Sequence, residues 1–188
     1  MSLPSSPASG FRLSSAEPRH AVLFCFALLT VSCALASFAL ACATPFAAFA
    51  VIAAAMLPLR AALLVTTGAW LVNQGIGFGA LHYPIDAHTM IWGLVICIAA
   101  LAATMAAAAV LRLQGRTFVL LALALLCGYG GYELVLFAAT PFLGGADSFT
   151  AAIVGRIGLT NGVWLIGLVA VCEIARLVRG ASESPARA

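Results

Sequence analysis

The stretch Leu71–Trp92, LVNQGIGFGALHYPIDAHTMIW, lies between two long apolar runs and differs from the rest of the chain. It holds two side-chain amides, two imidazoles, a carboxylate and a tyrosine, whereas most other positions are Ala, Leu, Val or Phe. Glycines and a proline interrupt the backbone among these polar groups. We therefore expect a loop that carries a ligand site between two helices. The residues concerned are Asn73, Gln74, His82, Tyr83, Asp86 and His88, with Gly75, Gly77, Gly79 and Pro84.

The composition of the 188-residue chain is that of a membrane protein. Charged residues make up 8% of the sequence and hydrophobic residues 64%. A soluble domain carries about 25% charged residues, so this chain cannot cover a water-facing surface. We expect an all-α polytopic membrane protein that has lipid as its solvent. The net charge of +3 is too small and too scattered to indicate a nucleic-acid partner.

Apolar runs predict six transmembrane helices in one bundle between residues 21 and 178. About 20 apolar residues cross a bilayer. Residues 45–76 are too long for one span and Pro58 divides them, so we expect two helices there. The first of the two is short, and we expect it to be tilted or to cross only part of the membrane. The other runs are residues 21–43, 87–111, 117–139 and 151–178.

The arginines predict that both ends of the chain are cytoplasmic. With the N-terminus inside, eight of the nine arginines fall on the inner side, as the positive-inside rule expects. Only Arg156 lies towards the outer side. Residues 1–20 are polar and predict a disordered cytoplasmic tail, and residues 179–188 form a second tail.

Polar residues within the predicted helices fall in their outer halves. Asn73 and Gln74 lie near the outer end of the third helix. The inner halves are almost entirely apolar, so we expect a pocket that faces the outside and is closed towards the cytoplasm. The outer halves of the later helices contain Trp92, Tyr129, Tyr132 and Glu133.

Glu133 and Arg156 are charged residues at membrane depth. A charge at the centre of a spanning helix costs about 2.5–3.5 kcal/mol on insertion scales. We expect both side chains to face the bundle interior and each other. The pair then either closes the fifth helix against the sixth or forms part of the site.

The cluster of His82, Asp86 and His88 leaves several interpretations open. Two imidazoles and a carboxylate can hold a divalent ion. Alternatively, one imidazole can be the axial ligand to a metal already held in the ring of a ligand. A solvated loop explains the same residues without any ligand. Tyr83 and Trp92 lie at the outer boundary, where aromatics either anchor a helix or stack on a planar ligand.

Neither the cysteines nor the short motifs indicate an enzyme or a resident cofactor. The sequence has no GxSxG, HExxH or P-loop pattern, so we expect no enzyme, and a transporter would draw its energy from a partner or a gradient. No two cysteines form a CxxC arrangement, and thiols inside apolar runs behave as small hydrophobes. Of the six cysteines, Cys42 fits this interpretation least well, because it lies at a helix end.

The architecture over residues 21–178 resembles the substrate-binding S-components of energy-coupling-factor (ECF) vitamin transporters. The local sequence NQGIGFGALHYP at residues 73–84, with Trp92 and Gly93 after it, is similar to the outer-loop region of BtuM-type cobalamin S-components. The resemblance implies a substrate-binding and translocating subunit in a bacterial inner membrane. Its substrate would be cobalamin or a related corrinoid, taken up at the outer face, and its partners the lipid bilayer and an ECF transmembrane/ATPase module.

The resemblance also implies roles for residues. In BtuM-like proteins a cysteine coordinates the cobalt in this region, but residues 73–93 contain none, so His82 would be the axial ligand or Cys42 would reach in. The alternative remains a cobalt or nickel permease that uses His82, Asp86 and His88. The other substrate-binding residues implied are Asn73, Gln74, Phe78, Tyr83, Asp86, Trp92, Tyr129, Tyr132, Glu133 and Arg156.

Overall fold

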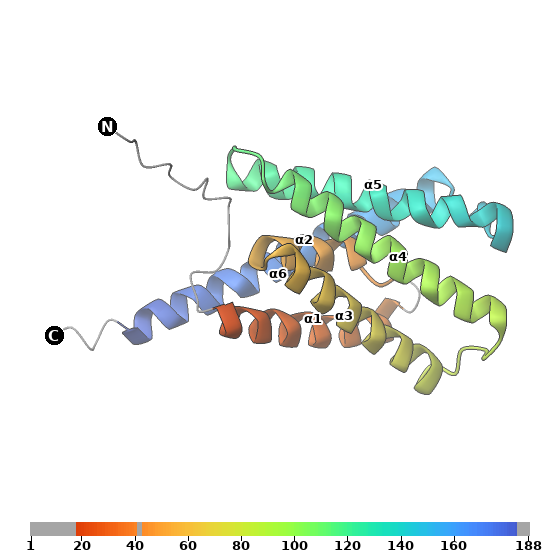
Figure 1. The fold of residues 1–188 in the computed structure, drawn as a ribbon, viewed down its shortest axis with the longest axis horizontal. Helices are drawn as coiled ribbons and strands as arrows, with labels where there is room; N and C mark the ends of the chain where they lie inside the picture. The colour runs from red at the N-terminus through yellow and green to blue at the C-terminus, as the bar shows by residue number, and fades with distance from the viewer. Residues whose placement is uncertain (1–17, 41–42, 184–188) are drawn as a thin grey trace.

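The computed structural model describes residues 18–40 and 43–183, which fold into six α-helices and a short 3₁₀ helix (Figure 1). No strand occurs in these residues, so the all-α prediction is confirmed. α1 and α6 each take in a few residues of a predicted tail, and the rest of both tails lies outside the described residues. The helices are α1 Pro18–Leu40, α2 Phe46–Met56, α3 Leu59–Gly79, α4 Ala87–Val110, α5 Thr117–Leu143 and α6 Ala151–Glu183, with the 3₁₀ helix η2 at Ala146–Ser148.

Five of the six α-helices are long and apolar enough to cross a membrane, as expected of a polytopic membrane protein. The exception is α2, which has 11 residues. At 1.5 Å per residue it is about 16 Å long, half the thickness of a hydrocarbon core of about 30 Å. Six helices are thus found where six were predicted, five of them with the length and composition of a membrane span, and the sixth is the short helix expected after residue 45.

Local backbone chemistry sets the ends of the helices. Leu57 is extended (φ −125°, ψ 155°), as is usual before a proline, and Pro58 then precedes α3. The side chain of Asp86 caps the first turn of α4. α5 ends at Leu143 and is followed by Gly144 (φ 75°) and Gly145 (φ 85°), whose positive φ angles glycine adopts without a steric penalty.

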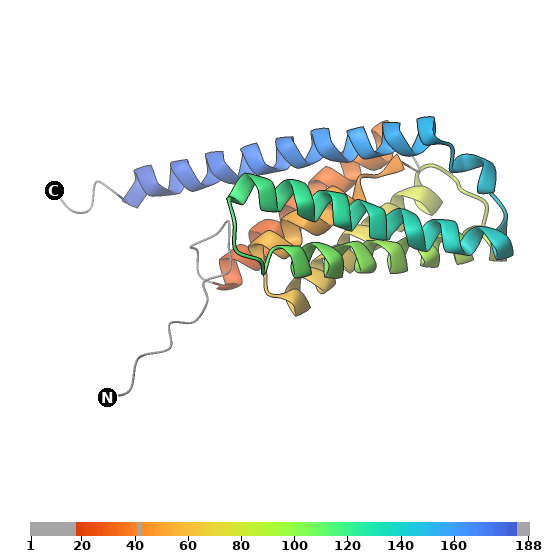
Figure 2. The same cartoon turned by 90° about the horizontal axis from the view of Figure 1, so that it is seen from above.

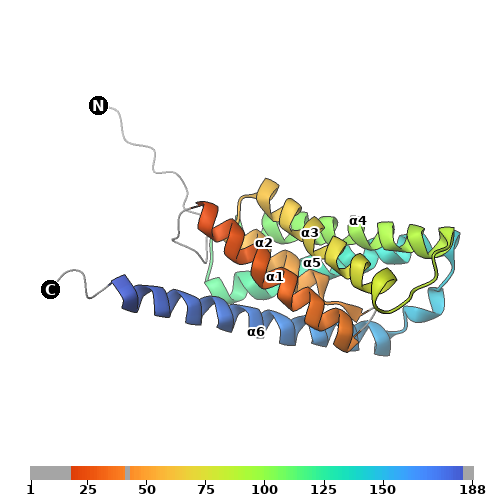
Figure 3. The same ribbon diagram turned by 90° about the horizontal axis from the view of Figure 1, so that it is seen from below.

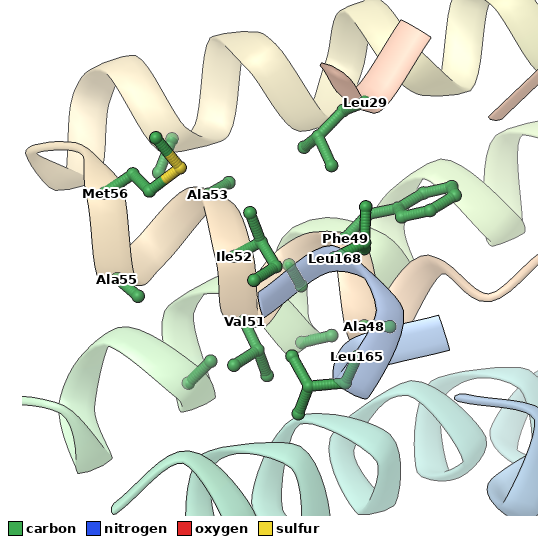
Figure 4. Close-up of a cluster of buried hydrophobic side chains, with 14 of the residues drawn as sticks. Leu29, Ala48, Phe49, Val51, Ile52, Ala53, Ala55, Met56, Leu165 and Leu168 are labelled. Atoms are coloured by element: carbon green, nitrogen blue, oxygen red, sulfur yellow. The ribbon is translucent and has the colours of Figure 1, made fainter. Parts of the chain in front are cut away.

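The short helix α2 lies at the centre of the bundle and contacts all five long helices. Nearly every one of its residues is buried, including both phenylalanines. A helix that is apolar on all sides is stable where protein surrounds it. Figure 4 shows its side chains between Leu29 of α1 and Leu165 and Leu168 of α6. The five long helices turn large apolar side chains outward, as lipid-facing surfaces do.

The two ends of the bundle differ in chemistry. The start of α1, the end of α6 and the α2–α3 and α4–α5 turns lie at one end (Figures 1 and 3). We name it the arginine end, because Arg19, Arg60, Arg112 and Arg116 lie in these segments. The α3–α4 and α5–α6 connections, residues 80–86 and 144–150, lie at the opposite end, which we name the polar end.

Helix α6 forms one side of the molecule and extends past the other helices at the arginine end (Figure 2). It packs mainly against α2 and makes a smaller contact with α5. The residues that face the bundle share one stripe of the helix, which contains Asn161, Leu165, Leu168 and Cys172. The rest of its circumference is largely exposed to the surroundings.

Candidate functional site

A hydrogen-bonded cluster of amides and hydroxyls joins α1, α3 and the segment before α2. The Nδ2 atom of Asn73 donates to Ser37 Oγ at 2.9 Å and to Thr44 Oγ1 at 3.1 Å. The Nε2 atom of Gln74 donates to Asn73 Oδ1 at 3.2 Å. Ser37 is 1% exposed and Thr44 is 4% exposed, so these polar groups lie inside the protein. We name Ser37, Thr44, Asn73 and Gln74 the amide cluster.

Gln74 also packs against Gly93 of α4. A Cβ atom on Gly93 would lie 2.5 Å from Gln74 Oε1, so glycine leaves room for the amide. One turn earlier on α3, Trp70 Nε1 donates to the Gly93 carbonyl at 2.8 Å. The glycine after Trp92 therefore has a packing role, which the sequence motif alone did not reveal.

The N-terminus of α2 begins inside the bundle, next to the amide cluster. Thr44 and Pro45 precede it as buried non-helical backbone. Such backbone occurs at membrane depth only where protein or a cavity surrounds it. The first amide groups of α2 need acceptors outside the helix. Ala48 N finds one in Oδ1 of Asn161, at 3.0 Å.

Asn161 of α6 is 2% exposed and also donates from Nδ2 to the Ile157 carbonyl at 3.0 Å. A residue 113 positions along the chain from Ala48 thus completes the start of the central helix. The aligned peptide dipoles give that helix end a partial positive charge. Ser37, Thr44 and Asn161 were not among the predicted site residues. In the sequence, the only indication of their role is that each is a polar residue within an apolar run.

The loop after α3 folds back on the helix through Tyr83. Tyr83 N donates to the Gly77 carbonyl at 3.0 Å, and the ring lies where a Cβ on Gly77 would come within 2.8 Å. The Phe78 and Tyr83 rings meet edge to face, with centroids 6.5 Å apart. His82, between the helix end and Tyr83, is exposed and has a left-handed backbone (φ 55°).

Asp86 and His88 make structural contacts at the polar end. Oδ1 of Asp86 accepts from Thr89 N at 2.7 Å, and this hydrogen bond holds the pKa of the carboxyl below its usual range. His88 Nε2 lies 2.9 Å from the Leu143 carbonyl oxygen and so connects the two loops of this end. Trp92 lies beside Gly145, whose added Cβ would be 3.7 Å from the indole.

The predicted metal set of His82, Asp86 and His88 is not assembled. The described residues contain no group of three His, Cys, Asp or Glu side chains that could hold a metal ion. The physical reason is that Asp86 caps α4 and His88 is directed at Leu143. Cys42, the other candidate metal ligand, lies outside the described residues.

The two tyrosines of α5 have different surroundings. Tyr132 is buried, and its ring is stacked on Phe46 at the start of α2, with centroids 6.4 Å apart. Tyr129 faces α6 and donates its hydroxyl to the Val154 carbonyl at 2.6 Å. The half-buried carboxyl group of Glu133 lies next to this hydroxyl.

The expected ion pair of Glu133 with Arg156 is wrong, because Arg156 faces away from α5. Val154 and Gly158 are the residues of α6 that contact Tyr129. Arg156 is two positions from each, and two positions on an α-helix are about 200° apart. Its side chain is consequently exposed. The ion pair found in the described part of the chain is Arg176–Glu173, 2.8 Å apart, near the end of α6.

The predicted residues thus form two levels at the polar end. Asn73 and Gln74 lie in the inner level, where Asn73 is hydrogen-bonded to Thr44 just before the start of α2. One turn further along α3 begins the outer level, which contains Phe78, His82, Tyr83, Asp86, His88 and Trp92.

A helical bundle with five long apolar helices and a buried polar cluster defines the class as polytopic α-helical membrane protein. Comparisons with protein-family models, with curated proteins and with solved structures found no match to this chain.

Proposed function

We propose that this chain is a membrane-embedded subunit that binds and translocates cobalamin or a related corrinoid. The observation that carries the proposal is the position of α2. A short helix begins within the bundle, and its positive end lies beside the amide cluster. Transporters use such interrupted helices to place a helix N-terminus at their substrate site near the middle of the membrane.

The distribution of arginines supports an orientation for this subunit. The positive-inside rule assigns the arginine end to the cytoplasm, so the polar end faces the outside. The chain would then reside in a bacterial inner membrane, with both of its termini cytoplasmic. The amide cluster would be reached from outside, past the loop that carries His82 and Tyr83.

His82 is the residue we propose as axial ligand to the corrinoid cobalt. Asp86 and His88 make structural hydrogen bonds, whereas the His82 ring is exposed. Its left-handed backbone is uncommon for a residue other than glycine, and such outliers are functional candidates. Neutral imidazole is the commonest metal ligand in proteins.

The other contacts would come from both levels of the polar end. Asn73 and Gln74 offer side-chain amides, which match the amide groups around a corrin ring in hydrogen-bonding chemistry. Phe78, Tyr83 and Trp92 offer aromatic surfaces to its flat apolar parts. Their present contacts within the protein would have to be exchanged for contacts with the substrate.

A divalent-metal permease has less support from the geometry. Such a site needs several ligands around one point, and two of the three residues expected to provide them are directed elsewhere. The sequence has no nucleotide-binding motif, so energy for uptake would come from an ATPase partner or from a gradient.

The test is binding of hydroxocobalamin to the purified protein in lipid nanodiscs. An imidazole that replaces water on cobalt shifts the visible absorption bands of the corrinoid. We expect co-purifying corrinoid with shifted bands for the wild type and for His88→Ala, and no shift for His82→Ala. His88→Ala is the matched control, because it removes the other imidazole of the polar end, in the first turn of α4. Failure of the wild type to retain corrinoid, or unchanged bands in His82→Ala, would overturn the proposal.

A further inference from the structure

Helix α6 is held to the bundle along one side only. Most of its circumference faces outward, and its bundle-facing stripe contacts α2 and a short part of α5 (Figure 2). Lipid tails are as apolar as leucine, so apolar side chains gain no hydrophobic free energy when one helix joins another. Close packing and hydrogen bonds must therefore decide whether α6 stays docked.

In the described part of the chain, two hydrogen bonds from N–H or O–H donors link α6 to other helices, and both lie in its half nearer the polar end. Asn161 Oδ1 accepts from Ala48 N of α2, and the Val154 carbonyl accepts from Tyr129 of α5. Nearer the arginine end, the contacts are apolar or involve sulfur. A weaker thiol contact, from Cys172 Sγ to Met56 Sδ at 3.8 Å, lies there. Trp164 meets Phe49 edge to face at 6.3 Å, and Leu165 and Leu168 join the core.

The bond to Ala48 links the position of α6 to the state of α2. If α6 moved away, Ala48 N would lose its acceptor inside the membrane, where an amide without a hydrogen-bond partner is strongly unfavourable. The movement therefore requires that another acceptor take the place of Asn161. A water molecule or a substrate oxygen that reached the start of α2 would supply one.

The connection between α5 and α6 provides a place where the chain can bend. Gly144 and Gly145 both have positive φ angles, 75° and 85°, and the short helix Ala146–Ser148 follows. Neither glycine has a side chain to restrict its backbone, and an added Cβ on Gly144 would meet nothing within 4 Å.

We propose that α6 is a movable wall of the binding site and that Asn161 is the positioning residue that holds it closed. When an acceptor from outside satisfies the amide of Ala48, α6 is released and moves about Gly144 and Gly145. The side of the bundle between α5 and α6 then opens at the level of the amide cluster. The inference rests on the proposed function only in that the incoming acceptor belongs to the transported substrate.

The first test measures hydrogen–deuterium exchange in a peptide that covers residues 46–49, with the protein in nanodiscs. Asn161→Leu should speed exchange there about 3- to 20-fold, the range that corresponds to one interhelical hydrogen bond. Thr160→Val is the matched control, since its hydroxyl bonds only to the Arg156 carbonyl within α6. Equal exchange in the two variants would overturn the role of Asn161.

A second variant tests whether α6 moves as a unit. Its result can be interpreted even if Asn161→Leu fails to fold. Tyr129→Phe removes the hydrogen bond that α5 donates to the Val154 carbonyl of α6, a bond that involves no atom of Ala48. If α6 is held as one wall, this change also speeds exchange at residues 46–49. Exchange identical to that of the wild type would show that Asn161 caps α2 locally, and the movable wall would be rejected.

Addition of hydroxocobalamin separates this proposal from the proposed function. Corrinoid that binds by absorption and alters exchange at residues 46–49 supports both. Corrinoid that binds without altering exchange there overturns the movable wall alone. If corrinoid fails to bind while both variants speed exchange, the wall stands and the proposed substrate is wrong.

Discussion

The ring of Tyr83 lies against Gly77, two residues before the end of α3, where a Cβ atom would come within 2.8 Å of the ring. This contact and the hydrogen bond from Tyr83 N to the Gly77 carbonyl fix how the chain leaves the helix. His82 is the residue immediately before Tyr83. The exposed imidazole is thus positioned by a glycine five residues away.

Gly77→Ala should weaken corrinoid binding, because the added methyl group displaces the Tyr83 ring and with it His82. We expect a loss of affinity of about ten- to a hundredfold, since misplacing a functional group by 1 Å can cost about a hundredfold. Titration of hydroxocobalamin followed by absorption measures it. Gly75→Ala is the matched control, because a Cβ there meets nothing within 4 Å. Equal affinities of the two variants would contradict the positioning role of Tyr83.

Asn73→Leu should destabilise the protein, because it removes two hydrogen bonds between α3 and the segments that carry Ser37 and Thr44. Each interhelical hydrogen bond in a membrane contributes about 0.6–1.7 kcal/mol. Unfolding in mixed detergent micelles, monitored by tryptophan fluorescence, gives the change in free energy. Thr67→Val is the comparison, since that hydroxyl bonds within α3 to the Leu63 carbonyl. A loss no larger than that of Thr67→Val would argue against a stabilising amide cluster.

The cap of α4 should make stability depend on pH. The hydrogen bond from Thr89 N lowers the pKa of Asp86 in the folded protein below its unfolded value of about 3.9. A depressed carboxyl pKa stabilises the fold fully above the unfolded value, and the contribution is lost as pH falls through the folded value. The melting temperature of the wild type should therefore drop more steeply below about pH 4 than that of Asp86→Asn, which keeps a capping oxygen. If the melting temperatures of the wild type and Asp86→Asn fell in parallel between pH 7 and pH 3, the charge of Asp86 would have no such effect.

Sidedness can be tested with a membrane-impermeant maleimide on intact cells. His82→Cys should be labelled from outside, because the residue is exposed at the polar end. Gly115→Cys, in the α4–α5 turn at the arginine end, should be labelled only in inverted vesicles. The native cysteines in helices should react little, since lipid or protein surrounds them. The reverse pattern would place the amide cluster near the cytoplasm and remove the basis for uptake.

Composition and run length were sufficient to predict the class of fold. The deficit of charge required lipid as the solvent, and Pro58 together with the short run before it predicted the limited length of α2. What the sequence did not predict is the rotation of each helix about its axis. Apolar residues surround these helices on all sides, so no polar face identifies the inward direction. That is why Glu133 and Arg156 were paired, although Arg156 points away from α5.

The candidate site was predicted in part for a related reason. Polar residues that are close in sequence, such as Asp86 and His88, were grouped, but a helix cap and a loop contact use them separately. The residues that surround the start of α2 come from segments far apart in sequence. Ser37, Thr44 and Asn161 each appear in the sequence as a polar residue among apolar ones. Only the packing of three helices on α2 places them around its start.

The central position of α2 also has a consequence for biosynthesis. A segment of 11 apolar residues is too short to enter a bilayer as an independent span, and the amide of Ala48 in its first turn is hydrogen-bonded to Asn161 of α6. We therefore expect residues 44–57 to reach their final place only after α6 has left the ribosome. A chain truncated after Leu143 should insert its earlier long helices but leave this segment open to proteases.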